Sequence, residues 1–581
     1  MPYIPSSQTL FLPTSRREMG ERGWSNVDII LFSGDAYIDH PSFGIAVIGR
    51  VLESKGYRVA IVPQPNWKDD LRDFTKLGRP RLFFGVTSGN MDSMINHYTA
   101  AKRLRSNDAY TPEGRAGARP DRAVTRYTRI LKQLYPDVPV VIGGIEASLR
   151  RLSHYDYWEN RWKPSILVES GADYLVYGMG ECAINELAGK IRNRATVKEL
   201  RRTPQIAWFD ETGLSKEFLP KAVILNSYQE CVRNPQACID NFTVIEREAN
   251  KAEALVLVEP VADGCVVVNP PYPTMTSHEI DAIYDLPYTR LPHPRYQGKH
   301  IPAYEMIKHS ITLHRGCFGG CSFCTIAVHQ GKQIVSRSEA SIIKEVIAQK
   351  AHPDFKGVLT DLGGPTANMY GMKGKDETLC SGCLRTSCLF PERCGNLNVN
   401  HIRLTELYRM VRKEPFIRHA FIGSGIRYDL FMDEKGFIGE DGFIYFRELL
   451  RHHTSGRLKV APEHTEPHVL HHMEKPPFRL FERLKNHFEQ INSEENLHLQ
   501  IVPYFISAHP GCQEKDMAAL SKKMRAHKMS VEQVQDFTPT PMTRSSVMFH
   551  IGKELKSGIA LFVARENVLK NRQKTYFFKK K

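Results

Sequence analysis

Three cysteines within eight residues constrain this chain more than any other feature of its sequence. Cys317, Cys321 and Cys324 have the spacing C-x3-C-x2-C in the segment RGCFGGCSFCT. Thiolates are soft ligands, and three of them so close together indicate a single metal centre. A cubane iron–sulfur cluster that is held by only three cysteines keeps one iron atom free for a small molecule. The pattern therefore predicts a metal site with an open coordination position.

Two simpler sites would also use these cysteines. One is a structural zinc ion with a fourth ligand from elsewhere, and the other is a redox dithiol formed by Cys321 and Cys324. A zinc knuckle usually brings two paired sets of ligands, however, and a redox C-x-x-C needs no third cysteine. With the aromatic Phe323 just before the last cysteine, the motif resembles that of the radical S-adenosylmethionine (SAM) enzymes. The resemblance implies a [4Fe-4S] cluster whose open iron binds SAM, and we favour this interpretation.

Composition and charge indicate a globular protein of two or three domains. The 581 residues exceed one hydrophobic core, and 41% of them are apolar and 25% charged. No apolar run approaches the ~20 residues of a membrane helix, and a signal-peptide pattern is absent, so we expect a cytoplasmic protein without a membrane partner. The net charge of +15 permits an RNA substrate without indicating one. The basic end, residues 570–581, is expected to be solvated, with 576–581 as a tail beyond the last domain.

Strand and helix patterns alternate in the first 202 residues. Apolar runs near residues 28–32, 56–62, 81–86, 138–142 and 172–177 predict strands, and helical spacing appears over 42–55 and 121–134. Strands separated by helices form a parallel sheet with both faces covered. We therefore predict an α/β fold that begins with a doubly wound, Rossmann-like domain at residues 1–202.

The carboxyl ends of these strands are where such a sheet would bind a ligand. Gly34-Asp35, Gly143-Gly144 and the segments 87–90 and 178–181 follow strands there, and the arrangement looks like the cobalamin-binding domain that precedes many radical SAM cores. That domain's motif, Asp-x-His-x-x-Gly, is absent, because Asp39 and His40 are adjacent and Gly44 comes four residues later. Cobalamin is therefore not expected, although the sequence does not exclude it.

Residues 203–302 are expected to be an irregular, proline-rich linker. Mixed helical pieces occupy 203–250, and prolines crowd the segment 266–304. Proline favours extended chain because it fixes φ and removes a hydrogen-bond donor.

Strand and helix patterns alternate again in residues 303–575. Predicted strands lie near 310–314, 357–361, 419–423, 457–460, 497–504 and 531–537, with helices between them. About six such units fit an open (β/α)6-type partial TIM barrel, whose chemistry lies at the carboxyl ends of its strands. The cysteine loop begins at the end of the first of these strands, so the motif and the predicted fold agree.

Other strand ends in this half are candidates for holding SAM, by resemblance to the superfamily. The segment Asp361-Leu-Gly-Gly-Pro365 looks like the glycine-rich stretch that accepts the SAM ammonium group, with proline where the superfamily often has glutamate. An arginine is the best candidate to bind the SAM carboxylate, because its planar guanidinium pairs with carboxylates through two hydrogen bonds. For each position, ordinary loop hydrogen bonding is an equally good explanation. The predicted SAM-binding residues are Phe323, Arg337, Gly363, Gly364, Ser424, Arg427 and Glu463.

An insertion over residues 368–400 carries four more cysteines. Cys380, Cys383, Cys388 and Cys394 have gaps of two, four and five residues, short enough to surround one ion. Four thiolates suit a structural zinc site, which we favour, and equally an auxiliary iron–sulfur cluster that relays electrons or binds substrate. His401 could replace one of the ligands.

These features together resemble one family over nearly the whole chain. Stretches such as SGNMDSMINHYTAAKR, GGIEASLRRLSHYDYW and RGCFGGCSFCTIAVHQGKQIVSRS are similar to the YgiQ-type radical SAM proteins. The resemblance implies that the motif cysteines hold the cluster and that a deoxyadenosyl radical from SAM takes hydrogen from a substrate. The last three cysteines of the insertion fit the family pattern best.

The resemblance assigns no substrate and no catalytic side chain. Modification of RNA and of a metabolite therefore both stay open, and the expected reductant is a protein such as flavodoxin or ferredoxin. The opposing hypothesis is a non-catalytic zinc- or cluster-binding protein that binds RNA.

Overall fold

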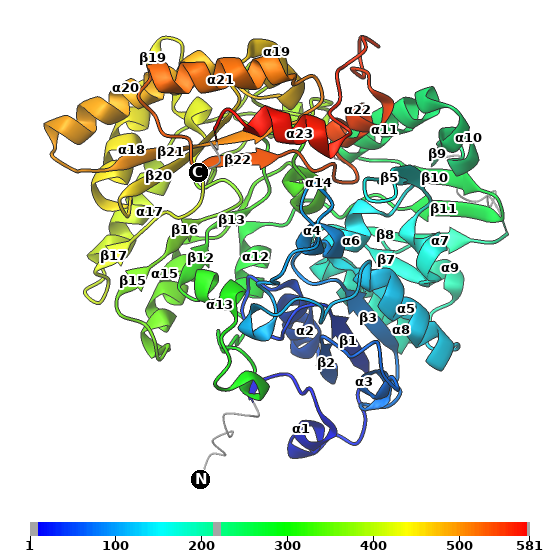
Figure 1. The fold of residues 1–581 in the computed structure, drawn as a ribbon. Helices are drawn as coiled ribbons and strands as arrows, with labels where there is room; N and C mark the ends of the chain where they lie inside the picture. Colours follow the sequence, from blue (N-terminus) through cyan, green and yellow to red (C-terminus); the bar gives the residue numbers. More distant parts are fainter. Residues whose placement is uncertain (1–9, 213–221, 252, 578–581) are drawn as a thin grey trace. The chain divides into compact units, whose positions relative to one another are not determined.

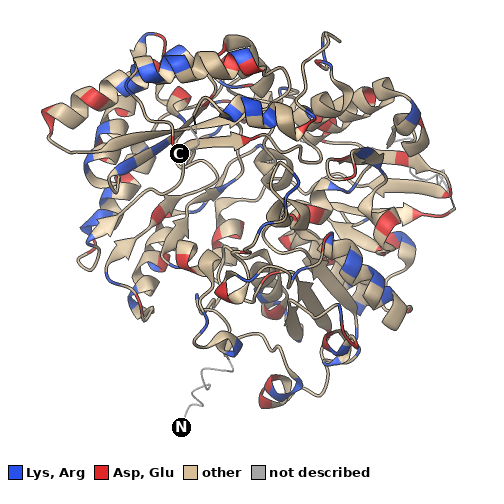
Figure 2. Cartoon of the chain, in the orientation of Figure 1, with Lys and Arg blue, Asp and Glu red and all other residues tan. Residues whose placement is uncertain are grey.

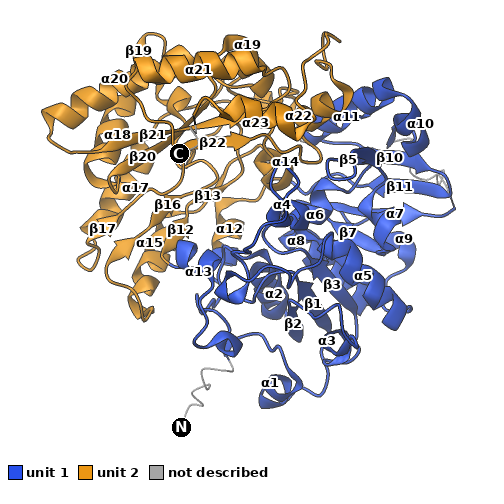
Figure 3. Ribbon diagram, in the orientation of Figure 1, with its two compact units in different colours: residues 1–249, 253–273, 282–308 blue, residues 250–252, 274–281, 309–581 orange. Residues whose placement is uncertain are grey.

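The computed structural model describes residues 10–212, 222–251 and 253–577, and the chain divides into two compact units (Figures 1 and 3). Unit 1 comprises residues 1–249, 253–273 and 282–308, and unit 2 comprises residues 250–252, 274–281 and 309–581. Each unit has its own apolar core. The main span of unit 2 thus begins at His309, close to the predicted start at residue 303.

Unit 1 is built on a nine-stranded sheet with the order β2-β1-β3-β4-β7-β8-β11-β10-β9 (Figure 1). The strands from β2 to β7 in that order pair in parallel, which confirms the predicted doubly wound fold. The strands of this sheet are β1 (Ile29–Ser33), β2 (Val59–Pro63), β3 (Phe83–Thr87), β4 (Val140–Gly143), β7 (Tyr174–Val176), β8 (Ile206–Asp210), β9 (Ala222–Ile224), β10 (Val256–Val261) and β11 (Gly264–Val268).

Helices cover both faces of the parallel part of this sheet. Successive side chains of a strand point to opposite faces. Leu31 of β1 packs in the core that contains Ile45 of α2, whereas the neighbouring Phe32 stacks on Phe74, whose ring in turn contacts Tyr127 of α5. The helices of unit 1 include α1 (Arg16–Glu21), α2 (Gly44–Ser54), α3 (Arg72–Thr75), α4 (Ser93–His97), α5 (Ala123–Leu134), α6 (Gly144–Leu149), α7 (Ile166–Ser170), α8 (Glu181–Arg192), α9 (Val197–Leu200), α10 (Tyr228–Arg233), α11 (Pro235–Ala249) and α13 (Pro302–Ile307).

The segment predicted as an irregular linker, residues 203–302, instead extends this sheet with β8 to β11. β8, β11 and β10 pair antiparallel, and β9 pairs parallel with β10. Apolar runs on both sides of Asp263-Gly264 form a tight hairpin, for which this dipeptide is a strong signal. Gly264 has φ +152°, and a Cβ there would lie 2.2 Å from the carbonyl oxygen of Asp210. The doubly wound sheet therefore has a mixed edge.

The proline-rich chain that follows also belongs largely to unit 1. Arg290 N donates to Asp39 O at 2.9 Å, and His293 N donates to Tyr37 O at 3.0 Å. Residues 37–39 continue the chain from β1, so the extended segment is held along them by backbone hydrogen bonds. Proline density here marks extended chain within a unit, and the predicted linker role is not observed.

Unit 2 contains a row of parallel strands in the order predicted for a partial barrel. β12 pairs with β16, β15 with β17, β20 with β21 and β21 with β22, and a bridge joins Ile426 to Val460. Within the described ranges no pairing joins β12 to β22, so the row stays open as expected. The strands of the row are β12 (Ser310–Thr312), β15 (Val358–Leu359), β16 (Asp361–Gly363), β17 (His419–Ala420), β20 (Arg457–Glu463), β21 (Gln500–Ser507) and β22 (Gln533–Asp536).

Helices connect these strands and bury their apolar sides in the core of unit 2. Unit 2 also contains two short antiparallel strand pairs outside this row. They are β13 (His314–Arg315) with β14 (Val335–Ser336), and β18 (Met432–Asp433) with β19 (Gly436–Phe437). The helices are α14 (Ile326–Gln330), α15 (Glu339–Ala348), α16 (Glu377–Ser381), α17 (Ile402–Lys413), α18 (Gly439–His452), α19 (Pro467–Met473), α20 (Phe478–Glu494), α21 (Glu514–Ala526), α22 (Arg544–Ile551) and α23 (Asn567–Lys574).

The basic C-terminal segment is more ordered than a solvated tail. Lys570 lies in α23 and is 1% exposed, with its ammonium group 5.8 Å from the ring centre of Phe549. Tyr576 donates a hydrogen bond to Glu514 at 2.9 Å, and residues 578–581 lie outside the described ranges. In the cartoon of Figure 2, the positions of positive and of negative residues are interspersed along the helices of each unit. None of the described helices combines the length and apolar character that crossing a bilayer requires.

Candidate functional site

The three motif cysteines lie on the loop between β13 and α14. Cys317 is buried, and Cys321 and Cys324 are partly buried. The chain turns tightly around them, because Gly316 and Gly320 have φ angles of +88° and +62°, a region that other residues rarely adopt. The shape of the loop therefore requires glycine at these two positions.

The three thiols are close enough to influence one another's ionisation. Burial, together with the neighbouring Cys321 and Cys317, raises the pKa of Cys324 to about 12. Burial also raises the pKa of Cys317, whereas Arg427 lowers it. Thiols in such surroundings keep their protons until a metal replaces them. The group therefore has the character of a metal-binding donor set.

This donor set suits a [4Fe-4S] cluster. In a cubane each thiolate binds a different iron atom, so the three sulfur atoms need not converge on one point. A single zinc ion, in contrast, would need every ligand at about 2.0–2.3 Å from the same centre. In residues 10–212, 222–251 and 253–577 no three His, Cys, Asp or Glu side chains are placed to hold one ion, and this includes both the motif cysteines and those of the insertion.

Arg427 places a positive charge beside the cysteines. Its Nη1 donates to Cys321 Sγ at 3.3 Å, and its Nη2 pairs with Asp429 Oδ2 at 2.6 Å. Although burial lowers the pKa of Arg427, Asp429 and Cys321 raise it well above its ordinary value. The backbone N of Arg427 also donates to Asn368 Oδ1 at 2.8 Å, which fixes the residue in place. Arg427 is thus a permanent cation beside thiolates that a cluster would require.

Glu463 and Lys475 form a second charged pair in this region. Lys475 Nζ lies 3.6 Å from Glu463 Oε1, and both side chains are buried. Met473, two residues before Lys475, accepts the backbone N–H of Ser322 at 3.1 Å, so the pair lies close to the cysteine loop. Glu463 has φ +67° at the end of β20, where the pairing with β21 shifts register. Such a conformation is uncommon for a residue with a side chain and marks an irregular strand end.

A third polar group joins two strand ends of the row. Asp361 accepts two backbone N–H groups, the nearer at 2.8 Å, and also the hydroxyl of Ser424. A Cβ on Gly363 would lie 3.1 Å from Ser424 Oγ, and one on Gly364 would lie 2.5 Å from the ring of His314. The predicted glycine-rich segment is therefore closely packed between its neighbours, and Ser424 is oriented by a buried carboxylate.

Arg337 has a structural role instead of the predicted position near SAM. Its guanidinium is fully buried and pairs with Glu345 of α15. It also donates to Thr312 O at 3.0 Å and to Ser341 O at 3.0 Å. Through these acceptors the arginine links α15 to β12, so it stabilises the wall of the barrel.

The last turn of the cysteine loop is anchored by the C-terminal part of unit 2. Ser322 Oγ lies 2.8 Å from Ser545 Oγ, which lies 2.7 Å from His509 Nε2. The backbone N of Ser545 donates to Ser322 O at 2.9 Å, and the ring of Phe323 meets that of His509 edge-on at 6.2 Å. Phe323 is therefore held beside the cysteines by aromatic contact.

Four residues of this region were missed by the sequence analysis. Asp429 had a local signal, since it follows Arg427 by two residues in the segment GIRYD. Lys475, His509 and Ser545 had none, because they reach the loop only through the fold.

The insertion cysteines form a second group. Burial raises the pKa of Cys388, and Cys394, Cys383 and Cys380 raise it further. All four are partly buried and free of disulfides. His401, considered as a substitute ligand, is instead fully buried against Tyr445, with ring centres 4.4 Å apart.

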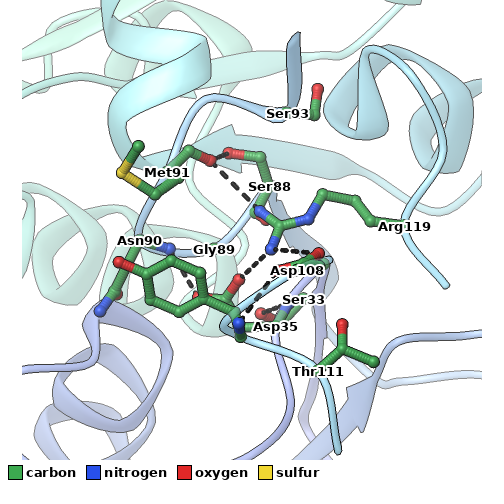
Figure 4. A network of polar contacts seen from close by, with 12 residues as sticks. Ser33, Asp35, Ser88, Gly89, Asn90, Met91, Ser93, Asp108, Thr111 and Arg119 are labelled. Atoms are coloured by element: carbon green, nitrogen blue, oxygen red, sulfur yellow. Dashed lines mark hydrogen bonds and ion pairs between the residues drawn. The ribbon is translucent and has the colours of Figure 1, made fainter. Parts of the chain in front are cut away.

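The strand ends of unit 1 carry a different polar network, shown in Figure 4. Asp35 follows β1, and its Oδ2 accepts the backbone N–H of Asn90, which follows β3, at 2.7 Å. Arg119 Nη2 lies 2.7 Å from Asp35 Oδ1 and 3.3 Å from Asp108 Oδ2, and these three charged residues are each 1% exposed. Burial raises the pKa of Asp35 to about 6, although Arg119 opposes this.

The ends of β1 and β3 are packed closely together beside this network. A Cβ on Gly34 would lie 2.3 Å from Ser88 O, so the two strand ends are in direct contact. Asp39 is buried in an ion pair with Arg50 at 2.5 Å, and His40 is 1% exposed. The Asp-His pair that replaces the expected cobalamin motif is thus part of the packing of unit 1.

Comparison with known proteins places the chain in a family. A model described as Radical SAM N-terminal matches residues 11–310. A UPF0313 protein of Bacteroides thetaiotaomicron is 54% identical over 98% of this chain and 94% of its own length. The chain belongs to the UPF0313 family, within the radical SAM superfamily. This confirms the radical SAM resemblance predicted from the sequence.

Other UPF0313 relatives cover the chain as completely. The protein of Porphyromonas gingivalis is 52% identical over 98% of this chain and 90% of its own length, and that of Methanocella arvoryzae is 44% identical over 95% and 90%. The name UPF0313 states no reaction, so the substrate is a matter for proposal.

Solved structures with a distant likeness were also found. The radical SAM methyltransferase TsrM of Kitasatospora setae, with cobalamin and a [4Fe-4S] cluster bound, matches with a TM-score of 0.49 and 15% identity, over 90% of this chain and 74% of that one. The cobalamin-dependent enzyme OxsB matches with a TM-score of 0.48 and 9% identity, over 94% and 58%. Similarities this low indicate nothing about what the UPF0313 chain binds.

Proposed function

We propose that this UPF0313 protein is a radical SAM enzyme whose [4Fe-4S] cluster is held by Cys317, Cys321 and Cys324. The observation that carries the proposal is that three buried or half-buried thiols share one short, tightly turned loop, with the cation of Arg427 donating to Cys321 Sγ at 3.3 Å. A cluster at this position would supply the electron that breaks the bond between SAM's sulfur and C5′, and the radical formed would take hydrogen from an unidentified substrate.

The residues of the chain would provide charge, orientation and exclusion of water. Arg427 neutralises part of the negative charge of the thiolates, and its own charge is secured by Asp429. Gly363, Gly364, Ser424 and Glu463 supply polar groups at neighbouring strand ends, where the amino, carboxylate and ribose groups of SAM would be bound. Ser424 is pre-oriented by Asp361, which lowers the entropic cost of binding. The electron donor would be a protein such as flavodoxin or ferredoxin.

The decisive experiment uses protein purified and reconstituted without oxygen. Wild type should absorb broadly in the visible range and, when reduced, show a paramagnetic iron signal that changes on addition of SAM. Cys317→Ala should lose the SAM-dependent change, whereas Cys182→Ala, a half-buried cysteine of unit 1, should retain it. With dithionite and SAM, wild type should release 5′-deoxyadenosine.

A colourless protein that contains zinc alone would contradict the proposal. It would support the opposing hypothesis of a non-catalytic metal protein, and RNA binding could then be measured directly. An iron signal that Cys317→Ala leaves unchanged would contradict the assignment of the ligands.

A further inference from the structure

The insertion of residues 368–400 folds into two closed turns, each of which presents a pair of cysteines. Cys380 lies at the end of α16, and the N–H of Cys383 donates to its carbonyl at 3.2 Å. Farther along, the N–H of Cys394 donates to the carbonyl of Cys388 at 2.8 Å. Backbone hydrogen bonds thus keep the two sulfur atoms of each pair on the same turn.

The two turns lie beside each other. Asn396, two residues after Cys394, donates from Nδ2 to Cys380 Sγ at 3.3 Å and to the carbonyl of Asp376 at 2.8 Å. The backbone carbonyl of the same asparagine accepts the N–H of Lys375 at 2.7 Å. The segment that follows the second cysteine pair is therefore bonded directly to the first pair.

Lys332 and Arg385 hold the insertion in place. Lys332 Nζ donates to the carbonyl of Arg385. Arg385 in turn donates to Ser387 O at 3.1 Å and to Phe390 O at 3.2 Å, across the turn that carries Cys388. These hydrogen bonds between protein groups define the shape of the segment.

The insertion is also attached directly to the loop of the first cysteine motif. The N–H of Cys388 donates to Phe318 O at 3.0 Å, and Ser387 Oγ donates to Gly319 O at 2.7 Å. A Cβ on Gly320 would lie 2.6 Å from Ser387 Cβ, so nothing separates the two loops there. Cys388 and Cys394 pack against the apolar cluster that contains Cys317 and Phe318.

We propose that Cys380, Cys383, Cys388 and Cys394 bind a second iron–sulfur cluster, on a loop that contacts the loop of the first. A purely structural zinc ion, favoured from the sequence, would serve to pin a mobile insertion, but the contacts of Lys332, Arg385 and Ser387 already pin it. Four thiolates in place of three leave the second cluster fully ligated by protein, so it would not bind SAM. The assignment goes beyond the proposed function and does not depend on it.

The experiment compares iron, sulfide and zinc contents of three variants of the full chain, purified and reconstituted without oxygen. The first lacks the motif thiols (Cys317→Ala, Cys321→Ala and Cys324→Ala together). The second lacks one thiol from each turn of the insertion (Cys383→Ala with Cys394→Ala). The third is the control Cys182→Ala. Thermal unfolding of each variant checks that it folds.

We expect about eight irons per chain in wild type and in the control, since each cubane holds four irons. The motif variant should keep about half of the iron, with a paramagnetic signal that SAM does not change. The insertion variant should also keep about half, with a signal that SAM does change.

If wild type contained about four irons and one zinc per chain, this result alone would overturn the proposal, without data from the variants. A motif variant without iron would overturn it as well. Failure of the proposed function gives a different result, in which wild type and the motif variant contain the same iron and only the insertion variant loses it.

Discussion

The strand ends of unit 1 and of unit 2 use the same device for different purposes. In each, an aspartate that follows or ends a strand accepts backbone N–H groups from the loop of the neighbouring strand: Asp35 from Asn90 in unit 1, and Asp361 from Ser424 in unit 2. In unit 1 Arg119 lies across the rest of the edge and forms ion pairs with two buried carboxylates. In unit 2 the edge adjoins the cysteine loop, where burial raises the pKa of Cys317 and of Cys324 and so favours the protonated thiols.

The comparison shows how a candidate binding site differs from a polar network that only stabilises the fold. Both edges are rich in buried charged groups, so polarity alone would mark both. Unit 1 satisfies its charges internally, whereas Cys317 and Cys324 of unit 2 would become thiolates on binding a metal. Variants of the two edges should therefore separate stability from iron binding.

All five tryptophans, at positions 24, 67, 158, 162 and 208, belong to unit 1. Tryptophan fluorescence during urea unfolding therefore reports on unit 1, while iron content and paramagnetic signals report on unit 2. The two edges can thus be followed separately in the intact chain.

The largest effect is expected from Arg119→Met. Removal of this cation leaves Asp35 and Asp108 buried without their partner, which should cost about 3–5 kcal/mol of unfolding free energy. The tryptophan transition should shift to lower urea, whereas the iron content of the folded fraction should not change. Arg17→Met, at an exposed pair with Glu21, is the control and should cost under about 1 kcal/mol. A loss of iron in Arg119→Met would contradict the separation of the two edges.

A smaller effect is expected from pH at Asp35. The native carboxyl keeps its proton up to about pH 6, whereas an unfolded aspartate loses it near pH 3.8. The folded chain therefore binds more protons between these values, and the contribution of Asp35 to stability falls as pH rises through this window. Relative to Asp35→Asn, wild type should lose about 3 kcal/mol from about pH 4 to about pH 7, because each pKa unit is about 1.4 kcal/mol. Urea unfolding of both proteins across this range measures the difference, and a constant difference would contradict the raised pKa.

In unit 2, Ser424→Ala should cost about 1–3 kcal/mol, since a buried carboxylate of Asp361 loses a hydroxyl donor. Because Ser424 is proposed to contact SAM, the concentration of SAM that changes the iron signal should rise while the iron content stays constant. Ser455→Ala, at an exposed position, is the matched control. Unchanged SAM dependence in Ser424→Ala would remove this residue from the proposed SAM site.

The smallest effect is expected from Ser545→Ala, about 1 kcal/mol for the loss of the hydrogen bonds to Ser322 and His509. Its backbone bond to Ser322 remains, so the loop should keep its cluster. The shape of the paramagnetic signal should nevertheless change, since Ser322 lies between two of the ligands. An identical signal would show that this anchor supports the fold without affecting the metal site.

The sequence predicted the regular parts of both units well. The alternation of apolar runs and helical spacing identified the parallel strands from β1 to β7 and the strands of the open barrel, because periodicity reflects burial on one or two faces. It also placed the cysteine loop at a strand end. The resemblance to radical SAM proteins was then confirmed by the family comparison.

The features that the sequence analysis did not predict either depend on long-range contacts or were hidden by a second local signal that indicated something else. The hairpin around Asp263-Gly264 was locally visible, yet the nearby prolines suggested a linker. The structural role of Arg337 was not visible, because Glu345 becomes its partner only when α15 packs on β12. Nor could a sequence show that Ser545, 223 positions from Ser322, reaches the cysteine loop.

The close fit of Gly320 on Ser387 has a consequence for biogenesis. The insertion contacts the loop that carries Cys317 through protein groups alone, and it covers one side of that loop. Iron or sulfide delivered to the motif cysteines would therefore have to enter from another direction.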